Sequence, residues 1–259
     1  MSSPRPRQRR ACREAVPPAR RGGLLNFVRY FWHSLEPKTR PLVEGWPLEA
    51  ITLHLEALTF GDIPSNRLLM NVPPGFMKSL LVNVFWPAWE WGPCNMPHMR
   101  YISFSYSDEI TTRDNNKMVR LVTSPAYQQL WGDRFQMTKT GERRLENNQT
   151  GFKLATSVGG VSTGERGDRV LLDDPHNVIN AESDLEREKT VRFVRESMSN
   201  RLNDERSAIV VIMQRLHEGD VSGDILAREA NYCHMMIPMY FEWNWDVVMN
   251  GPHDWLDLE

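Results

Sequence analysis

The sequence predicts an α/β fold in which a mainly parallel sheet lies between helices. Short apolar runs alternate along the chain with longer segments of helical periodicity, which is typical of parallel strands joined by crossover helices. Several of these runs are continuously apolar, as expected for strands buried on both faces. With 259 residues, the chain is long enough to bury a full core as one large domain or two small ones.

Apolar periodicity places the expected elements in a regular order. The expected strands are Arg67 to Val72, Arg100 to Tyr106, Gly151 to Ala155, Val170 to Asp173, Ala208 to Met213 and His234 to Pro238. The expected helices are Pro47 to Phe60, Ser79 to Trp91, Ser107 to Leu121, Ser183 to Leu202 and Asp220 to Ala230. This alternation of strands and helices is the basis of the predicted fold class.

The turn after the first expected strand has the features of a phosphate-binding loop. It reads Asn71-Val72-Pro73-Pro74-Gly75-Phe76-Met77-Lys78-Ser79 and leads directly into an expected helix. In such loops backbone N–H groups and the helix N-terminus face the phosphates, a lysine reaches the β/γ oxygens and a Ser or Thr hydroxyl ligates magnesium. The predicted phosphate-contacting residues are Pro74, Gly75, Phe76, Met77, Lys78 and Ser79, with Ser79 also a metal ligand.

The loop departs from the usual pattern G-x-x-x-x-G-K-[ST], since Val72 and Met77 stand where glycines are usual. Taken alone, the loop is equally well explained as a strand-turn-helix junction with a solvated lysine. A second motif is therefore needed to support phosphate binding.

That second motif is the apolar run Arg169-Val170-Leu171-Leu172, which ends in Asp173, Asp174 and Pro175. A buried strand that delivers two carboxylates at its end is typical of a Walker B site. Asp173 is the predicted magnesium-side residue, and Asp174 is the predicted catalytic base that activates water. The alternative is an ordinary Asp-Asp-Pro turn after a strand.

Together the phosphate loop and the two carboxylates predict a P-loop NTPase (ASCE-like). The segment from Trp46 to Pro238 also resembles the ATPase domain of the large terminase subunit of tailed bacteriophages and prophages. The resemblance rests on the phosphate loop, Ile102 to Ser107, Ala155 to Asp168, Leu171 to His176 and Met213 to Asp220. It implies an Mg²⁺-dependent ATPase that moves viral double-stranded DNA into a procapsid. The implied partners are double-stranded DNA, a portal protein, the small terminase subunit and other copies in a homo-oligomeric ring.

The resemblance also implies roles for further residues. Gln214 and Arg215 follow an apolar strand that is expected beside the phosphate-loop strand, where they would contact the γ-phosphate or its attacking water. The alternative for Arg215 is an ion pair with Glu218 or Asp220. Arg166, in a glycine-flanked loop, is the candidate arginine finger, acting within its own subunit or on a neighbour. Trp46 is a candidate adenine contact, although an aromatic before a helix is more often a packing anchor.

Composition is consistent with a cytoplasmic enzyme. Cys12, Cys94 and Cys233 are scattered, so no disulfide framework is expected. The sequence shows neither a membrane-length apolar run nor the apolar core of a secretory signal. Its histidines lack zinc-ligand spacing, so a zinc site is not expected. We expect the chain to act in the cytoplasm of a bacterial host, transiently at the procapsid portal.

The expected organisation has three parts. Residues 1–23 form an arginine-rich arm that is expected to be disordered, and that either contacts DNA phosphates or is a solvated tail. Residues 24–238 form the ATPase domain, and residues 239–259 form a linker toward a nuclease domain that this chain would lack. Two alternative functions are a catalytically inactive prophage remnant that binds nucleotide or serves in assembly, and a helicase-like DNA ATPase.

Overall fold

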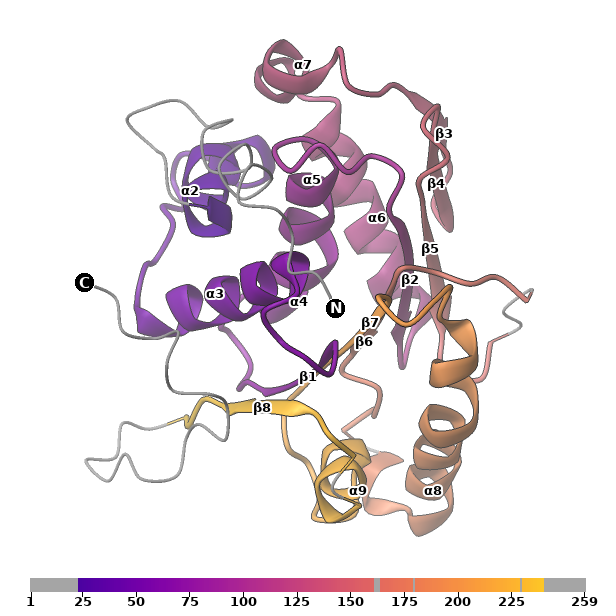
Figure 1. The fold of residues 1–259 in the computed structure, drawn as a ribbon. Helices are drawn as coiled ribbons and strands as arrows, with labels where there is room; N and C mark the ends of the chain where they lie inside the picture. Colours follow the sequence, from indigo (N-terminus) through magenta and orange to yellow (C-terminus); the bar gives the residue numbers. More distant parts are fainter. Residues whose placement is uncertain (1–22, 161–163, 179, 229, 240–259) are drawn as a thin grey trace.

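The computed structural model describes residues 23–160, 164–178, 180–228 and 230–239 (Figure 1). In this part of the chain an eight-stranded sheet has the order β3-β4-β5-β2-β6-β7-β1-β8. The strands are β1 (Arg67–Asn71), β2 (Arg100–Ser105), β3 (Met137–Thr140), β4 (Arg144–Asn147), β5 (Phe152–Ser157), β6 (Arg169–Asp173), β7 (Ala208–Met213) and β8 (Cys233–Met236). The expected basic arm falls outside the described residues except for Gly23, and the expected tail falls outside them except for Met239.

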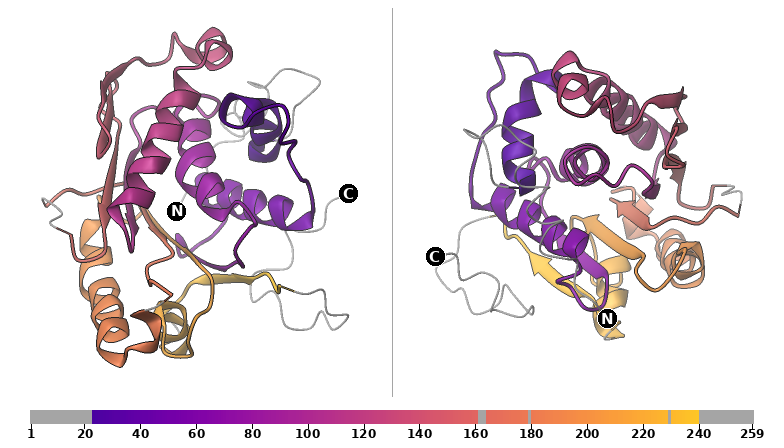
Figure 2. Two further views of the ribbon diagram at one scale, coloured as in Figure 1. Left: turned by 180° about the vertical axis from the view of Figure 1, so that it is seen from behind. Right: turned by 45° about the horizontal axis from the view of Figure 1, so that its top comes forward.

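Helices cover both faces of the sheet (Figures 1 and 2). One layer contains α2 (Gly23–Leu35), α3 (Trp46–Phe60), α4 (Lys78–Leu80), the π-helical segment η2 (Leu81–Phe85), α5 (Trp86–Trp91), α6 (Asp108–Val122) and α7 (Pro125–Trp131). The other layer contains η3 (Asn180–Glu182), α8 (Asp184–Phe193), η4 (Val194–Met198), η5 (Ser199–Arg201) and α9 (Val221–Ala227). The predicted α/β architecture, with the sheet between helices, is confirmed.

The sheet is mainly parallel, as predicted. From β5 through β2, β6, β7 and β1 to β8, every neighbouring pair is parallel. The antiparallel pairs in the described sheet are β3 with β4 and β4 with β5, at one edge. Since the carboxyl ends of parallel strands meet at one edge of a sheet, the segments that follow β1, β6 and β7 lie close together.

Alternate residues of the central strands enter two separate cores, because successive side chains point to opposite faces. In β1, Leu68 and Met70 pack with the layer of α2 to α6, whereas Leu69 packs with the layer of α8 and α9. Both cores are largely inaccessible to solvent. This two-sided burial explains why the strands read as continuous apolar runs.

The six expected strands and five expected helices are all present, with boundaries shifted by a few residues. The sequence analysis missed α2, α7, β3 and β4. The hairpin strands escaped notice because β3 is a polar, mostly exposed edge strand without an apolar run. Helix α2 was missed although its inner side is apolar: Phe27 and Phe31 pack against Tyr127 and Trp131.

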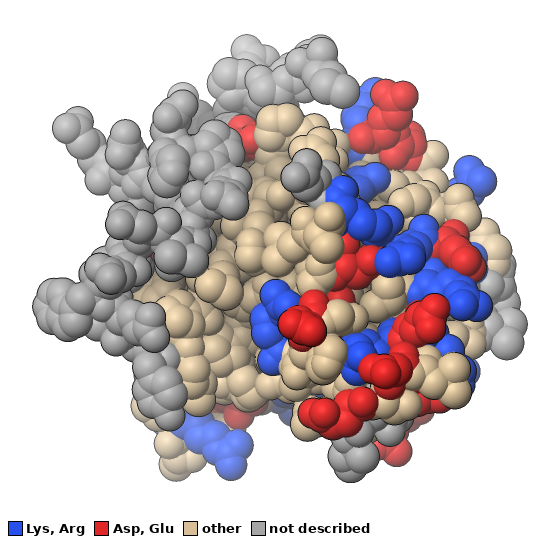
Figure 3. All heavy atoms as spheres, turned by 90° about the horizontal axis from the view of Figure 1, so that it is seen from below, with Lys and Arg blue, Asp and Glu red and all other residues tan. Residues whose placement is uncertain are grey.

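Charges of both signs are mixed on the surface that α8 and α9 present (Figure 3). Asp224 pairs with Arg195 and with Arg228, and Lys189 pairs with Glu186 at 2.6 Å. This surface is therefore not a single-sign patch of the kind that binds nucleic acid phosphates. None of the described helices has both the length and the apolar character required to cross a bilayer.

Candidate phosphate and metal site

The loop between β1 and α4 contains two residues with left-handed backbone conformations. Gly75 has φ 90° and Met77 has φ 56°. Glycine adopts such angles without strain, whereas methionine adopts them at a cost of about 1–2 kcal/mol. Met77 thus takes a backbone conformation suited to the glycine that the usual motif has at this position. Methionine in place of glycine therefore adds strain energy to the loop, but it does not prevent the loop from adopting the shape of a phosphate-binding loop.

Lys78, the first residue of α4, has its ammonium group at the centre of the site, in contact with Asp174 and Val72. Its side chain is only 7% exposed, and its Nζ lies 2.8 Å from Oδ1 of Asp174. Nζ also donates to the carbonyl oxygen of Val72 at 3.3 Å. The alternative interpretation of the loop, a junction with a solvated lysine, is therefore wrong. A buried ammonium group at the start of a helix is placed to bind an anion.

Asp174 follows the last residue of β6 and links three parts of the site. Besides its ion pair with Lys78, its Oδ1 accepts the backbone N–H of Gln214 at 3.0 Å. Asp174 itself has φ 40°, an unfavourable angle for a residue with a side chain. Backbone strain of this kind costs on the order of 1–3 kcal/mol and is concentrated at functional sites.

Asp173 lies deeper than Asp174 and is 1% exposed. Its Oδ2 accepts a hydrogen bond from Nδ2 of Asn83 at 3.0 Å. Burial, together with the neighbouring Asp174 carboxylate, raises the pKa of Asp173 to about 7, and the hydroxyl of Ser79 partly opposes this rise in pKa. The two adjacent carboxylates therefore differ in environment, with Asp173 beside Ser79 and Asp174 beside Lys78.

The residues around Asp173 suit a magnesium ion in the way the sequence predicts. Oδ1 of Asp173 is buried and has no hydrogen-bond partner within the described part of the chain. Mg²⁺ prefers oxygen ligands and is usually held by one or two protein groups together with waters and substrate phosphates. A site of this kind needs few protein ligands, so it is compatible with the lack of any cluster of three His, Cys, Asp or Glu ligands among the described residues.

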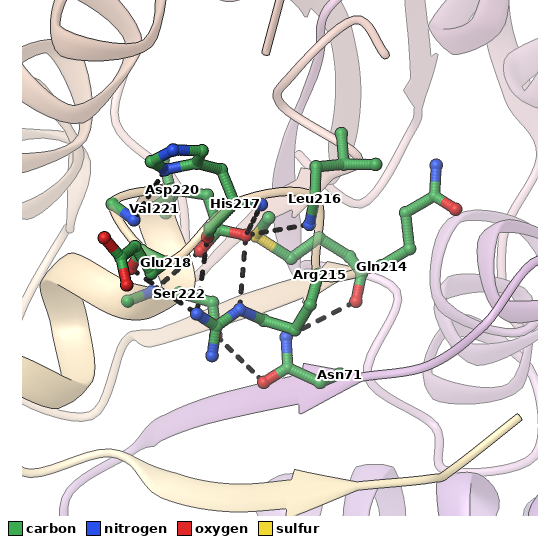
Figure 4. Close-up of polar contacts among 12 residues, drawn as sticks. Asn71, Gln214, Arg215, Leu216, His217, Glu218, Asp220, Val221 and Ser222 are labelled. Carbon is green, nitrogen blue, oxygen red and sulfur yellow. Dashed lines mark hydrogen bonds and ion pairs between the residues drawn. The ribbon is translucent and has the colours of Figure 1, made fainter. Parts of the chain in front are cut away.

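The segment after β7 lies beside the phosphate loop, because β7 pairs with β1 on one side and with β6 on the other. The backbone of Gln214 contacts Asp174, as noted above, and the Gln214 side chain points away from the polar cluster around Asp220 (Figure 4). The predicted position of this strand beside the phosphate-loop strand is confirmed. The structure does not bring the Gln214 side chain into a hydrogen bond within the described residues.

Arg215 does not point to the phosphate loop. Its Nε lies 3.2 Å from Oδ2 of Asp220, and its Nη2 approaches the carbonyl oxygens of His217 and Glu218 (Figure 4). The alternative interpretation, an ion pair with a nearby carboxylate, is the one that the structure shows. We therefore drop the predicted catalytic role of Arg215 in this conformation and assign the residue to the turn before α9.

Arg166, the candidate arginine finger, lies in the segment before β6. It is exposed and stands next to Gly167, whose N–H donates to the carbonyl oxygen of Arg201. This segment precedes β6, whereas Asp173 ends that strand, so the two lie at opposite edges of the sheet. Seven residues of extended chain span about 23 Å. Arg166 is therefore remote from Asp173 along this strand, and its role as an arginine finger, within its own subunit or on a neighbouring copy, stays a prediction.

Several buried polar residues near the site were missed by the sequence analysis. Asn71, which ends β1, accepts a hydrogen bond at Oδ1 from Ser222 at 2.9 Å (Figure 4). The same Oδ1 lies 2.8 Å from Nε2 of His234. Asp220 is fully buried, caps α9 through Gly223 N–H and holds Arg215. The available signal was an Asp at the first position of an expected helix, where a capping residue is favoured.

The comparisons with known proteins add no family assignment. No family model matches this chain, and a search of curated proteins found no match. The interpretation of the site therefore rests on its residues and geometry.

Proposed function

We propose that this chain is a magnesium-dependent ATPase of the P-loop class, and more specifically the ATPase domain of a terminase large subunit that moves double-stranded DNA. The observation that carries the ATPase proposal is the convergence of four residues at one sheet edge. Lys78 and Ser79 come from the loop after β1, whereas Asp173 and Asp174 come from the end of β6. Phosphate, metal and water would each meet a suitable side chain there.

The order of the strands supports the same proposal. β7 lies between the phosphate-loop strand β1 and the strand β6 that delivers the carboxylates. This arrangement brings the Gln214 backbone into contact with Asp174. A group at the end of β7 is therefore linked to the candidate base, as a sensor of bound phosphate would need to be.

The residues suggest a division of labour during hydrolysis. Lys78 and the first N–H groups of α4 would bind the β- and γ-phosphate oxygens of ATP. Ser79 and Asp173 would hold Mg²⁺, which neutralises charge on the phosphates when bound. Asp174 would orient the attacking water and accept its proton as the water oxygen bonds to the γ-phosphorus and the bond to ADP breaks.

The ion pair between Lys78 and Asp174 gives this scheme a built-in control. The carboxylate of Asp174 is engaged by the ammonium group of Lys78 at 2.8 Å. The phosphates of ATP would compete for the same ammonium group, so Asp174 would be released for water only when a triphosphate occupies the loop. Nucleotide binding would thus activate the base.

The motor assignment rests on the sequence resemblance to terminases, not on the site alone. It carries the proposed partners: double-stranded DNA, a portal protein, the small terminase subunit and further copies of the chain in a ring. It also carries the proposed location in the cytoplasm of a bacterial host. A polar, oxygen-rich site that binds ATP and Mg²⁺ would be expected in any P-loop ATPase, so the site does not distinguish a terminase from the others.

The test is Mg²⁺-dependent ATP hydrolysis with and without linear double-stranded DNA, at protein concentrations that permit ring assembly. We expect turnover that DNA stimulates and that Lys78→Ala abolishes. Turnover that DNA does not affect would support an ATPase but contradict the motor assignment. Tight ATP binding without turnover would favour the alternative of an inactive nucleotide-binding or assembly module.

A further inference from the structure

We propose that Asn83 is a positioning residue of the metal site, which holds one oxygen of Asp173 so that the other remains available to the hydration shell of Mg²⁺. This inference rests on the proposed ATPase function and extends it to a residue that the motifs do not include. Asn83 lies within the apolar run Leu80 to Phe85, where neither the phosphate-loop motif nor the resemblance assigns it a role.

The contact itself is short and buried. Asn83 is 2% exposed, Asp173 is 1% exposed, and Nδ2 of Asn83 lies 3.0 Å from Oδ2 of Asp173. A hydrogen bond to a charged group is stronger than one between neutral groups, and an unpaired buried carboxylate oxygen is costly. The amide of Asn83 therefore occupies Oδ2 of Asp173 and leaves Oδ1 as the oxygen without a protein donor in the described part of the chain.

The position of Asn83 in the helix explains how it reaches Asp173. Residues four apart on a helix share a face, so Asn83 lies on the same side as Ser79. Helical backbone continues from Lys78 through the π-helical segment η2, which contains Asn83 at its centre, to Trp91. Single π-turns inside helices occur frequently at functional sites. One helix thus supplies both the phosphate-loop hydroxyl and the group that orients Asp173.

Two oxygens of this pair are available to a hydrogen-bond donor from outside the described part of the chain. Oδ1 of Asp173 and Oδ1 of Asn83 are both buried, and neither has a hydrogen-bond partner in the described part of the chain. Ser105, whose Oγ is also buried without a partner there, stands opposite Asp173 in the pairing of β2 with β6. Buried acceptors without protein partners are usually satisfied by ordered water. Waters of a hydrated Mg²⁺ beside Ser79 would supply the required donors.

The chemistry of the amide matters for this role. An amide N–H₂ group donates to a carboxylate without adding charge, and its oxygen can accept from metal-bound water. Leucine has nearly the same shape but would leave Oδ2 of Asp173 unsatisfied in the core. Asp173 would then lose its fixed orientation toward the metal. Residues that orient ligands in this way typically change metal affinity by about 10- to 100-fold when they are replaced.

The test measures the affinity for a fluorescent ADP analogue with saturating Mg²⁺ and with EDTA, in the natural chain and in Asn83→Leu. The ratio of the two affinities is the gain due to magnesium. We expect Asn83→Leu to keep its metal-free affinity within about 2-fold and to lose about 10-fold or more of the magnesium gain. Val84→Ala is the matched control, because Val84 is a buried neighbour in the same π-helical segment. It should keep the full gain.

A double-mutant cycle with Asp173→Asn separates positioning from general destabilisation. If Asn83 acts through Asp173, then adding Asn83→Leu to Asp173→Asn will cause no further loss of the magnesium gain. Thermal unfolding in EDTA identifies variants that do not fold, and in that case the smaller Asn83→Ala replaces Asn83→Leu in every measurement.

The outcomes distinguish a failure of the proposed ATPase function from a failure of the role of Asn83 alone. A natural chain that binds the nucleotide analogue with no gain from magnesium overturns the proposed function and this inference with it. A natural chain with a clear gain that Asn83→Leu retains in full overturns only the role of Asn83. Equal losses in Asn83→Leu and Val84→Ala also overturn it, because they show a structural effect of the π-helical segment.

Discussion

Lys78 Nζ and Asp174 Oδ1 form an ion pair at 2.8 Å, although the two residues are 96 positions apart in the sequence. The pair joins the loop after β1 to the end of β6. It is partly shielded from water, with the side chains 7% and 25% exposed. An anion that binds Lys78 would draw on the same ammonium group as Asp174, so anion binding would weaken the hold of Lys78 on this carboxylate.

Lys78→Ala should weaken ATP binding by about 10- to 100-fold, because a hydrogen bond to a charged group is worth about 1.5–3 kcal/mol. Isothermal titration with Mg·ATP measures this loss. Lys139→Ala is the control, since Lys139 is an exposed lysine on β3. Equal affinities in the natural chain and Lys78→Ala would show that this ammonium group does not contact the nucleotide.

Met77→Gly should preserve ATP affinity, because glycine adopts the left-handed angle of this position without strain. Met77→Val should reduce both affinity and stability, since a β-branched residue fits a positive φ poorly. The thermal midpoint and the ATP affinity of the two variants are compared directly. A larger loss of affinity in the glycine variant than in the valine variant would refute this account of the loop.

Arg215→Ala should leave ATP affinity within about 3-fold of the natural value, because its guanidinium binds Asp220 instead of the phosphate loop. Asp220→Ala should lower the free energy of unfolding by about 1–2 kcal/mol, since it removes the cap of α9. Urea unfolding and nucleotide titration check both effects. A 10-fold loss of affinity in Arg215→Ala would restore its predicted contact with phosphate.

Lys153 predicts a specific dependence of stability on pH. It is fully buried, and burial lowers the pKa of its ammonium group from 10.5 to about 8, with Asp114 and Asp173 opposing the shift. Between pH 8 and 10.5 the folded chain releases this proton while the unfolded chain still binds it, so stability rises with pH. The rise due to Lys153 is up to about 3 kcal/mol.

Comparison with Lys153→Met isolates this contribution, because the variant lacks the titrating group and keeps the others. The free energy of unfolding of the natural chain should rise relative to that of the variant as pH increases from 8 to 10.5. Parallel pH curves for the two chains would show that the pKa of Lys153 is not lowered by folding.

The sequence predicted the central architecture because that architecture depends on local patterns. Continuous apolar runs identified β1, β6 and β7, and the two carboxylates after Leu172 marked where β6 ends. The Lys78-Ser79 pair likewise marked the start of the helix that follows β1. These features follow from neighbouring residues, so they can be recognised without a structure.

Other features depend on contacts between distant segments. The choice of Asp220 rather than Glu218 as the partner of Arg215 depends on how the turn before α9 folds back. The distance of Arg166 from the site depends on the path of the loop before β6. Asn83 was overlooked because a lone polar residue inside an apolar helix carries no motif, although its spacing of four residues from Ser79 was an available signal.

The proposed role of Asp174 can be tested by comparing Asp174→Asn with the natural chain in both Mg·ATP affinity and ATP turnover. Asparagine would remove the competing charge beside Lys78 and the proposed base. We expect Asp174→Asn to bind Mg·ATP at least as tightly as the natural chain, while turnover falls by about 10²- to 10⁴-fold. Turnover equal to that of the natural chain, or weaker binding together with lost turnover, would contradict the claim that Asp174 is a base restrained by Lys78.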